Sequence, residues 1–159
     1  MIRETYFIKR EDFNSGLTNA LKSFTIYTPQ EGLSDIEWKR LKEEDIDKVV
    51  YDQTRPPVPL KRFFLPPKER VSDSLPEEKM ILIGVKACDL AALDIMDAVF
   101  LKGDFVDPFY RERRKNSLII SADCTFPRDV CFCILRGYKP YPEKGFDLNL
   151  SPSGEGVTQ

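Results

Sequence analysis

The chain has 159 residues, of which 42% are hydrophobic, so it is long enough to form one domain with its own core. Its net charge of -2 at pH 7 gives no electrostatic reason to expect a general nucleic-acid binder. It contains four cysteines and no histidine, which excludes mixed Cys-His zinc sites, haem ligation by histidine and hydrolases that use a histidine base.

Nothing in the sequence predicts membrane insertion or secretion. No apolar run approaches the roughly 18 residues that a spanning helix needs, and the first residues, Met1 to Glu4, do not begin a signal peptide. A cytoplasmic protein is therefore expected. In that compartment cysteines are more often metal ligands or buried thiols than disulfides.

The first third of the chain predicts a strand, a helix and a second strand. Residues 2–8 have the pattern of a strand, and residues 9–23 carry apolar side chains at helical spacing. Residues 24–28 alternate as a further strand, which Pro29 is expected to end. The charged segment 32–46 is ambiguous.

Residues 54–71, TRPPVPLKRFFLPPKERV, contain five of the twelve prolines. Proline at this density excludes a regular helix or a central strand. We expect a long Pro-rich loop that wraps the domain, with Phe63 and Phe64 in the core. The basic residues of this loop are candidates for binding a partner subunit or an anion; they are Arg55, Lys61 and Arg62.

Residues 80–101, MILIGVKACDLAALDIMDAVFL, are the centre of the predicted fold. The apolar run 80–85 predicts a strand that is covered on both faces. Asp89 is expected to cap a helix that begins on the next residue. Cys88 would then lie beside a helix N-terminus, where the dipole favours the thiolate that binds metals or attacks electrophiles.

A second buried strand is predicted at residues 117–122, after a turn and a basic segment. Strand, helix and strand in this order imply a parallel βαβ unit. The expected fold class is therefore α/β, with residues 1–150 forming a single compact domain around this unit in a mixed sheet, and residues 151–159 forming a frayed tail. Three arginines of the basic segment are further candidates for partner or anion binding: Arg111, Arg113 and Arg114.

The parallel unit also predicts where the cysteines meet. Cys88 follows the first strand and Cys124 the second, so both belong at the carboxyl edge of the sheet, where open α/β folds build their sites. Cys131 and Cys133 follow closely enough for their loop to fold back to the same edge.

Several chemistries remain open for these cysteines. Four thiolates suit a 4Fe-4S cluster or an all-cysteine zinc site, but the spacing C-x6-C-x-C is unusual for both, and zinc ranks lower because its usual spacings are absent. The alternatives are buried structural thiols and a redox-active thiol pair. A thiol enzyme with Cys88 as nucleophile is a distant possibility, because it would lack a histidine base.

Four segments of the chain, in order, carry a wider pattern: TRPPVPLKRFFLPPKE (54–69), ILIGVKACDLAALDIMDAVFL (81–101), DPFYRERRKNSLIISADC (107–124) and CFCILRGYKP (131–140). Together they resemble the N-terminal region of a family of iron-sulfur redox subunits. That family includes the beta subunit of soluble NiFe hydrogenases (sulfhydrogenases) and the A subunit of anaerobic sulfite reductase.

The resemblance implies an electron-transfer subunit, or a fragment of one, in a multi-subunit oxidoreductase, rather than a catalyst by itself. Its implied partners are a flavin subunit and a catalytic subunit. The cysteines that match the family's motifs become candidate ligands of a 4Fe-4S cluster, with zinc as the alternative cofactor; they are Cys88, Cys124, Cys131 and Cys133. A non-catalytic scaffold domain that positions partner subunits is the alternative function.

Members of the family are longer and carry ferredoxin-type clusters in their C-terminal half. No ferredoxin motif is present in this sequence. The resemblance therefore leaves two interpretations: the chain is a fragment of a longer subunit, with residues 151–159 as the start of a missing C-terminal ferredoxin-type domain, or it is a stand-alone relative that lost the relay.

Overall fold

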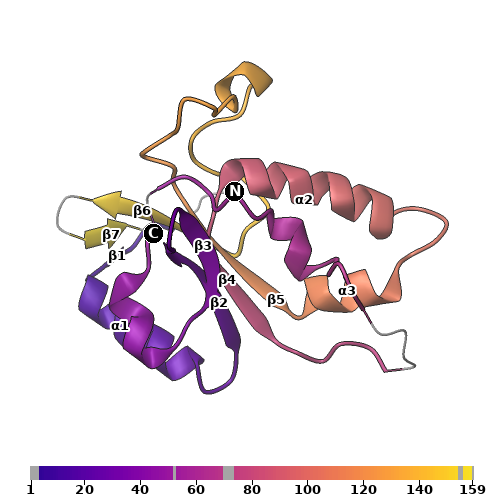
Figure 1. Ribbon diagram of the computed structural model, residues 1–159, viewed down its shortest axis with the longest axis horizontal. Coiled ribbons are helices and arrows are strands. Elements are labelled where there is room, and N and C mark those ends of the chain that lie inside the picture. The colour runs from indigo at the N-terminus through magenta and orange to yellow at the C-terminus, as the bar shows by residue number, and fades with distance from the viewer. Residues whose placement is uncertain (1–3, 52, 70–73, 154–155, 159) are drawn as a thin grey trace.

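The computed structural model describes residues 4–51, 53–69, 74–153, 156–158. These residues form one seven-stranded sheet in the order β1-β7-β6-β5-β4-β2-β3 (Figure 1). The strands are β1 (Phe7–Ile8), β2 (Thr25–Glu31), β3 (Ile36–Arg40), β4 (Met80–Val85), β5 (Ser117–Ala122), β6 (Leu148–Ser153) and β7 (Gly156–Thr158). The helices are α1 (Arg10–Ala20), α2 (Ala87–Phe100) and α3 (Pro108–Lys115), with short 3-10 helices η1 (Glu43–Lys48), η2 (Leu60–Phe63) and η3 (Ile134–Arg136).

The predicted α/β class and parallel βαβ core are confirmed. Strand β4 pairs in parallel with β2 on one side and with β5 on the other, and β5 pairs in parallel with β6. Antiparallel pairs lie toward both edges, where β3 joins β2 and where β7 joins β6 and β1. The sheet is therefore mixed, with its parallel strands at the centre. No helix in the described ranges is long and apolar enough to cross a bilayer.

Strand β4 is central because every one of its residues is buried. Ile81 and Ile83 face the cluster that contains α1, whereas Met80 and Leu82 face the cluster that contains α2. This division follows from the alternation of side chains along a strand. A bulge between Ile83 and Val85 shifts the register against β5. The strand is thus covered on both faces, as the apolar run predicts.

The expectation that Pro29 ends its strand is wrong. Strand β2 continues to Glu31, and Pro29 pairs with Trp38 of β3. The parallel pairing of β2 with β4 ends at Leu82, so position 29 does not need to donate an N–H to β4. The carbonyl of Pro29 accepts a hydrogen bond from the N–H of Val50. The strand predicted for residues 2–8 is shorter in the structure, where β1 covers only Phe7–Ile8. Residues 2–3 of that prediction lie outside the described residues.

Two further expectations need correction. Helix α2 begins at Ala87 with Lys86 as its N-cap residue, so Asp89 lies inside the first turn and does not cap the helix. The tail is not frayed where the structure describes it, because residues 151–153 belong to β6 and residues 156–158 to β7. Strand β7 pairs with β1, so the first and last strands lie side by side at one edge of the sheet (Figure 1).

The Pro-rich loop wraps the α2 face of the sheet, as expected. Phe64 is fully buried there, and its ring lies 6.0 Å from that of Tyr110 in α3. Phe63 is half-buried and packs edge-on against Trp38 of β3 at 5.5 Å. These aromatic contacts hold the loop to the domain without regular backbone pairing.

Gly84, in the β4 bulge, has a positive φ of 82°, and a Cβ there would lie 2.9 Å from Cγ of Pro29. We expect Gly84→Ala to destabilise the fold more than Gly137→Ala, whose φ is also positive at 74° but whose Cβ would meet nothing within 4 Å. The second variant carries only the backbone cost, on the order of 1–2 kcal/mol. Urea unfolding of both variants measures the difference, and equal losses would contradict the predicted clash with the proline ring.

An ion pair fastens α3 to α2. The Arg114 guanidinium donates two hydrogen bonds of 2.9 Å to the Asp97 carboxylate, and the Tyr110 hydroxyl donates a third of 2.6 Å. Burial alone would raise the pKa of the Asp97 carboxyl, but the bonds from Arg114 and Tyr110 outweigh it and lower that pKa. The carboxylate is thus held in its charged form between the two helices.

We expect Asp97→Asn to lower the free energy of unfolding at pH 7 by roughly 1–3 kcal/mol, the range for a hydrogen-bonded charged group. Because the folded pKa of Asp97 lies below its unfolded value, its stabilisation is present above about pH 4 and is lost as the pH falls through the folded pKa. The variant and the wild type should therefore converge in stability at low pH. Urea titrations between pH 7 and pH 2.5 test this, and a pH-independent difference would contradict it.

Candidate metal centre

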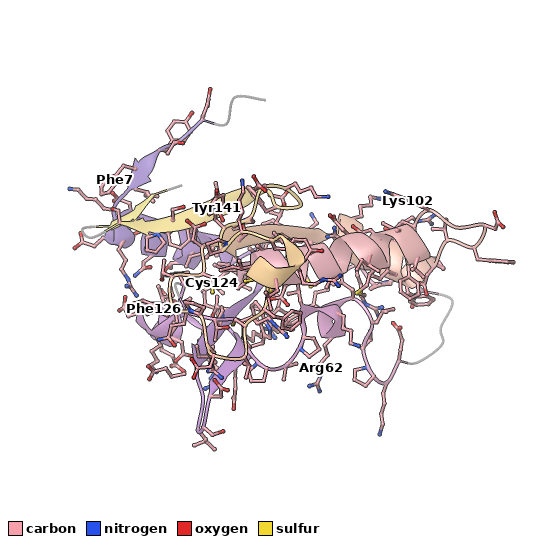
Figure 2. The ribbon with its side chains drawn as sticks, turned by 90° about the horizontal axis from the view of Figure 1, so that it is seen from above. Phe7, Arg62, Lys102, Cys124, Phe126 and Tyr141 are labelled. Atoms are coloured by element: carbon pink, nitrogen blue, oxygen red, sulfur yellow. The ribbon has the colours of Figure 1, made fainter. Side chains whose placement is uncertain are left out.

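The four cysteines come from three places in the fold that the topology brings to one edge of the sheet. Cys88 lies in the first turn of α2, directly after β4, and Cys124 follows β5 by two residues. Because β4 and β5 run parallel, both lie at the carboxyl edge. Cys131 and Cys133 lie in the loop that leads from β5 to β6. In Figure 2, Cys124 lies near the middle of the molecule, where this loop begins.

Backbone hydrogen bonds fold the cysteine loop back on itself. The Cys124 N–H donates to the carbonyl of Pro140 at 2.8 Å, and the N–H of Tyr138 donates to the carbonyl of Cys133 at 3.0 Å. The outgoing and returning segments of the loop are therefore held together, and the loop returns to the carboxyl edge of the sheet.

Cys131 has contacts from two sides. The backbone N–H of Arg128 donates to its sulfur at 3.3 Å, and the hydroxyl of Thr54, in the Pro-rich loop, lies 3.9 Å from the same sulfur. The Arg128 guanidinium forms an ion pair with Asp35, near the start of β3. This ion pair holds the pKa of the Asp35 carboxyl at about 2, so the anchor persists at neutral pH.

The environment of Cys88 differs from the sequence expectation. Its residue is exposed, but the surrounding protein desolvates the thiol and, together with the Asp89 carboxylate, raises its pKa to about 11. Arg55 acts in the opposite direction and is outweighed. The expected preference for the thiolate beside the helix N-terminus is therefore wrong: desolvation and the adjacent carboxylate favour the protonated thiol.

The pKa of the Cys124 thiol is raised, and other cysteines contribute to the shift. Burial raises the pKa of its thiol first, Cys131 and Cys133 raise it further, and the ammonium of Lys86 lowers it. Cys124 in turn raises the pKa of Cys88. The Cys124 thiol is therefore coupled electrostatically to the other three cysteines.

The candidate ligands all offer sulfur as the donor atom. All four cysteines are free thiols, and the sequence holds no imidazole to compete with them. Within the described ranges, no group of three or more cysteine, aspartate or glutamate side chains is arranged around a common point as metal ligands. Four soft sulfur donors around one sheet edge fit an iron-sulfur cluster or, less well by spacing, zinc.

The predicted basic residues separate into two groups. Most are engaged within the chain: Arg55 lies 3.8 Å from the Asp89 carboxylate, Arg113 pairs with Glu69, Arg114 pairs with Asp97, and Arg111 lies 3.7 Å from Glu112. Lys61 and Arg62 instead line an open groove of about 530 Å³ with the prolines and apolar side chains of the Pro-rich loop. Figure 2 shows Arg62 at the lower margin of that view, with its side chain pointing away from the domain.

Sequence reasoning missed three residues near the cysteines. Lys86, at the end of a wholly buried strand, is itself only 2% exposed. Its position directly after an apolar run was the available signal. Thr54 and Asp35 gave no such signal, because their contacts with the cysteine loop join positions 77 and 93 residues apart.

Comparison with known proteins gives one curated relative, the beta subunit of sulfhydrogenase 2 from Pyrococcus furiosus. It is 34% identical to this chain over 119 residues, which is 70% of the chain and 35% of the relative. The resemblance to this family is confirmed. The chain spans about a third of the length of the relative it matches. No protein-family model and no solved structure match the chain.

Proposed function

We propose that this chain is an electron-transfer domain of a multi-subunit oxidoreductase and that its cysteines hold a 4Fe-4S cluster. The ligands are Cys88, Cys124, Cys131 and Cys133. The observation that supports the proposal is the topology: Cys88 and Cys124 follow parallel strands at the carboxyl edge of the sheet, and Cys131 and Cys133 lie in the loop that leaves this edge, in a chain similar to a hydrogenase beta subunit.

The exposure of the cysteines argues against purely structural thiols. Structural cysteines are among the most buried residues, yet Cys88 and Cys131 are exposed and Cys124 and Cys133 are half-buried. The raised pKa of the Cys88 thiol keeps it protonated at neutral pH, which makes it a weak nucleophile.

The residues around the cysteines would hold and tune the centre. When bound, a 4Fe-4S cluster supplies a one-electron redox couple whose potential depends on nearby charges and on hydrogen bonds to sulfur. The Arg128 N–H provides such a bond to Cys131. Arg55 and Lys86 provide positive charge near Cys88 and Cys124. The exposed loop leaves the centre close to the surface, within reach of a partner.

The partners proposed are a flavin subunit and a catalytic subunit of the same complex. Lys61 and Arg62 line a groove whose apolar walls and positive rim suit an acidic partner surface. A cytoplasmic location is part of the proposal, since free thiols persist in that compartment.

A scaffold role is the second candidate. The cysteine loop exposes several apolar side chains, among them Phe132 at 65%, Ile134 at 77% and Leu135 at 88%. Exposed apolar side chains gathered on one loop are typical of a surface that contacts another protein. In this case the domain would position partner subunits without binding a metal.

Anaerobic reconstitution of the chain with iron and sulfide tests the two candidates. The electron-transfer proposal predicts brown protein with about four iron and four sulfide per chain. Protein whose four cysteines have first been alkylated is the control and should stay colourless. Colourless wild-type protein with four titratable thiols would contradict the cluster and favour the scaffold, and binding of zinc alone would assign the alternative cofactor.

A further inference from the structure

Lys86 is a buried cation at the base of the cysteine cluster. Its residue is 2% exposed and lies between the end of β4 and the first turn of α2. Removing an ammonium from water is costly, so a buried lysine requires polar partners. The structure gives it the carbonyl oxygens of Tyr51 and Asp123, the second at 2.9 Å from the nitrogen.

These hydrogen bonds join three segments beneath the cysteines. Lys86 comes two residues before Cys88, and Asp123 comes directly before Cys124. The carbonyl of Tyr51 belongs to the segment that leads into the Pro-rich loop, in which Thr54 approaches Cys131. The ammonium group of Lys86 therefore links the backbone next to Cys124 to the segment that leads toward Thr54.

Asp123 is itself held from the other side. Its carboxylate accepts hydrogen bonds from Asn149 at 2.9 Å and from Ser151 at 2.6 Å, both in β6. Since the carboxylate is oriented toward β6, the backbone carbonyl of Asp123 remains directed at Lys86. The position of the ammonium beside Cys124 is thus fixed from two directions.

We propose that Lys86 is a positioning residue that fixes the spacing of Cys88 and Cys124 and, through its ammonium charge, raises the reduction potential of the centre they hold. The inference rests on the proposed function. One-electron reduction adds one negative charge to a cluster with thiolate ligands, and a nearby cation in a region of low dielectric stabilises that added charge.

The test compares three substitutions of Lys86 in the anaerobically reconstituted chain. Lys86→Met removes the charge with little change in length, Lys86→Gln removes the charge but keeps an N–H donor, and Lys86→Arg keeps the charge. Lys22→Met is the matched control, because Lys22 is exposed and precedes β2, at the opposite edge of the sheet. Iron and sulfide content, circular dichroism and the midpoint potential in a titration with soluble one-electron mediators are measured for each.

We expect the neutral variants to shift the midpoint potential to more negative values, and Lys86→Arg and Lys22→Met to stay close to the wild type. Loss of iron from folded neutral variants, with retention in Lys86→Arg, would support the same role. If Lys86→Met does not fold, Lys86→Gln against Lys86→Arg carries the comparison. An unchanged potential in the neutral variants, or an equal shift in Lys86→Arg, would overturn the inference alone. Wild-type protein that takes up no iron would overturn the proposed function and the inference with it.

Discussion

Replacing Cys124 by serine should remove most of the iron that the wild-type chain takes up on anaerobic reconstitution. Cys124 follows β5 at the carboxyl edge of the sheet, and its backbone is fixed by the hydrogen bond from its N–H to the carbonyl of Pro140. A serine oxygen is a harder and far less acidic ligand than a thiol, so it cannot replace the lost sulfur at neutral pH. Iron and sulfide analysis, with the visible absorbance of the cluster, measures the loss.

Thr54→Val is the matched control for this substitution. Thr54 lies 3.9 Å from the sulfur of Cys131 but is not proposed as a ligand, so its loss should leave the iron content near that of the wild type. Circular dichroism separates ligand loss from unfolding. A Cys124→Ser protein that is folded and retains its full iron would rule out the four-cysteine assignment. Retention in Cys88→Ser alone would restrict the ligands to the three cysteines after β5.

The features that sequence reasoning predicted well depend on strong local patterns. The run from Met80 to Val85 is short and apolar at nearly every position, which is typical of a strand covered on both faces. Parallel pairing of β4 and β5 then follows from their spacing along the chain. The shared edge of Cys88 and Cys124 follows in turn, without any knowledge of side-chain contacts.

The features that it missed depend on contacts between distant segments. Pro29 can lie inside a strand because β4 stops pairing with β2 at Leu82, which no local rule about proline reveals. Asp89 has the residue type of an N-cap, but α2 begins two positions before it, at Ala87. Burial instead raises the pKa of the Asp89 carboxyl to about 6. The pKa of the Cys88 thiol rises for the same reason, because desolvation is a property of the folded neighbourhood and is not encoded in the residue's position on a helix.

The Pro-rich loop has a predicted energetic anchor in Phe64. Its side chain is fully buried against the ring of Tyr110, and the Arg114 guanidinium lies over its face at 5.2 Å. Its carbonyl accepts a hydrogen bond from Arg113, so backbone and side chain are both held by α3. Phe64→Ala should lower the free energy of unfolding by about 3–5 kcal/mol, since the cavity would remain between rigid elements.

Phe63→Ala is the matched control, because it removes the same ring from the adjacent residue. Phe63 is half-buried and packs on Trp38 and Tyr27 toward the edge of the sheet, so its removal leaves space that water can enter. We expect a cost of about half that of Phe64→Ala, since less apolar surface is exposed to solvent on unfolding. Urea unfolding at pH 7 compares the two. If both variants lost the same stability, the loop would be held by its aromatic pair as a unit, and the assignment of Phe64 as its anchor would fail.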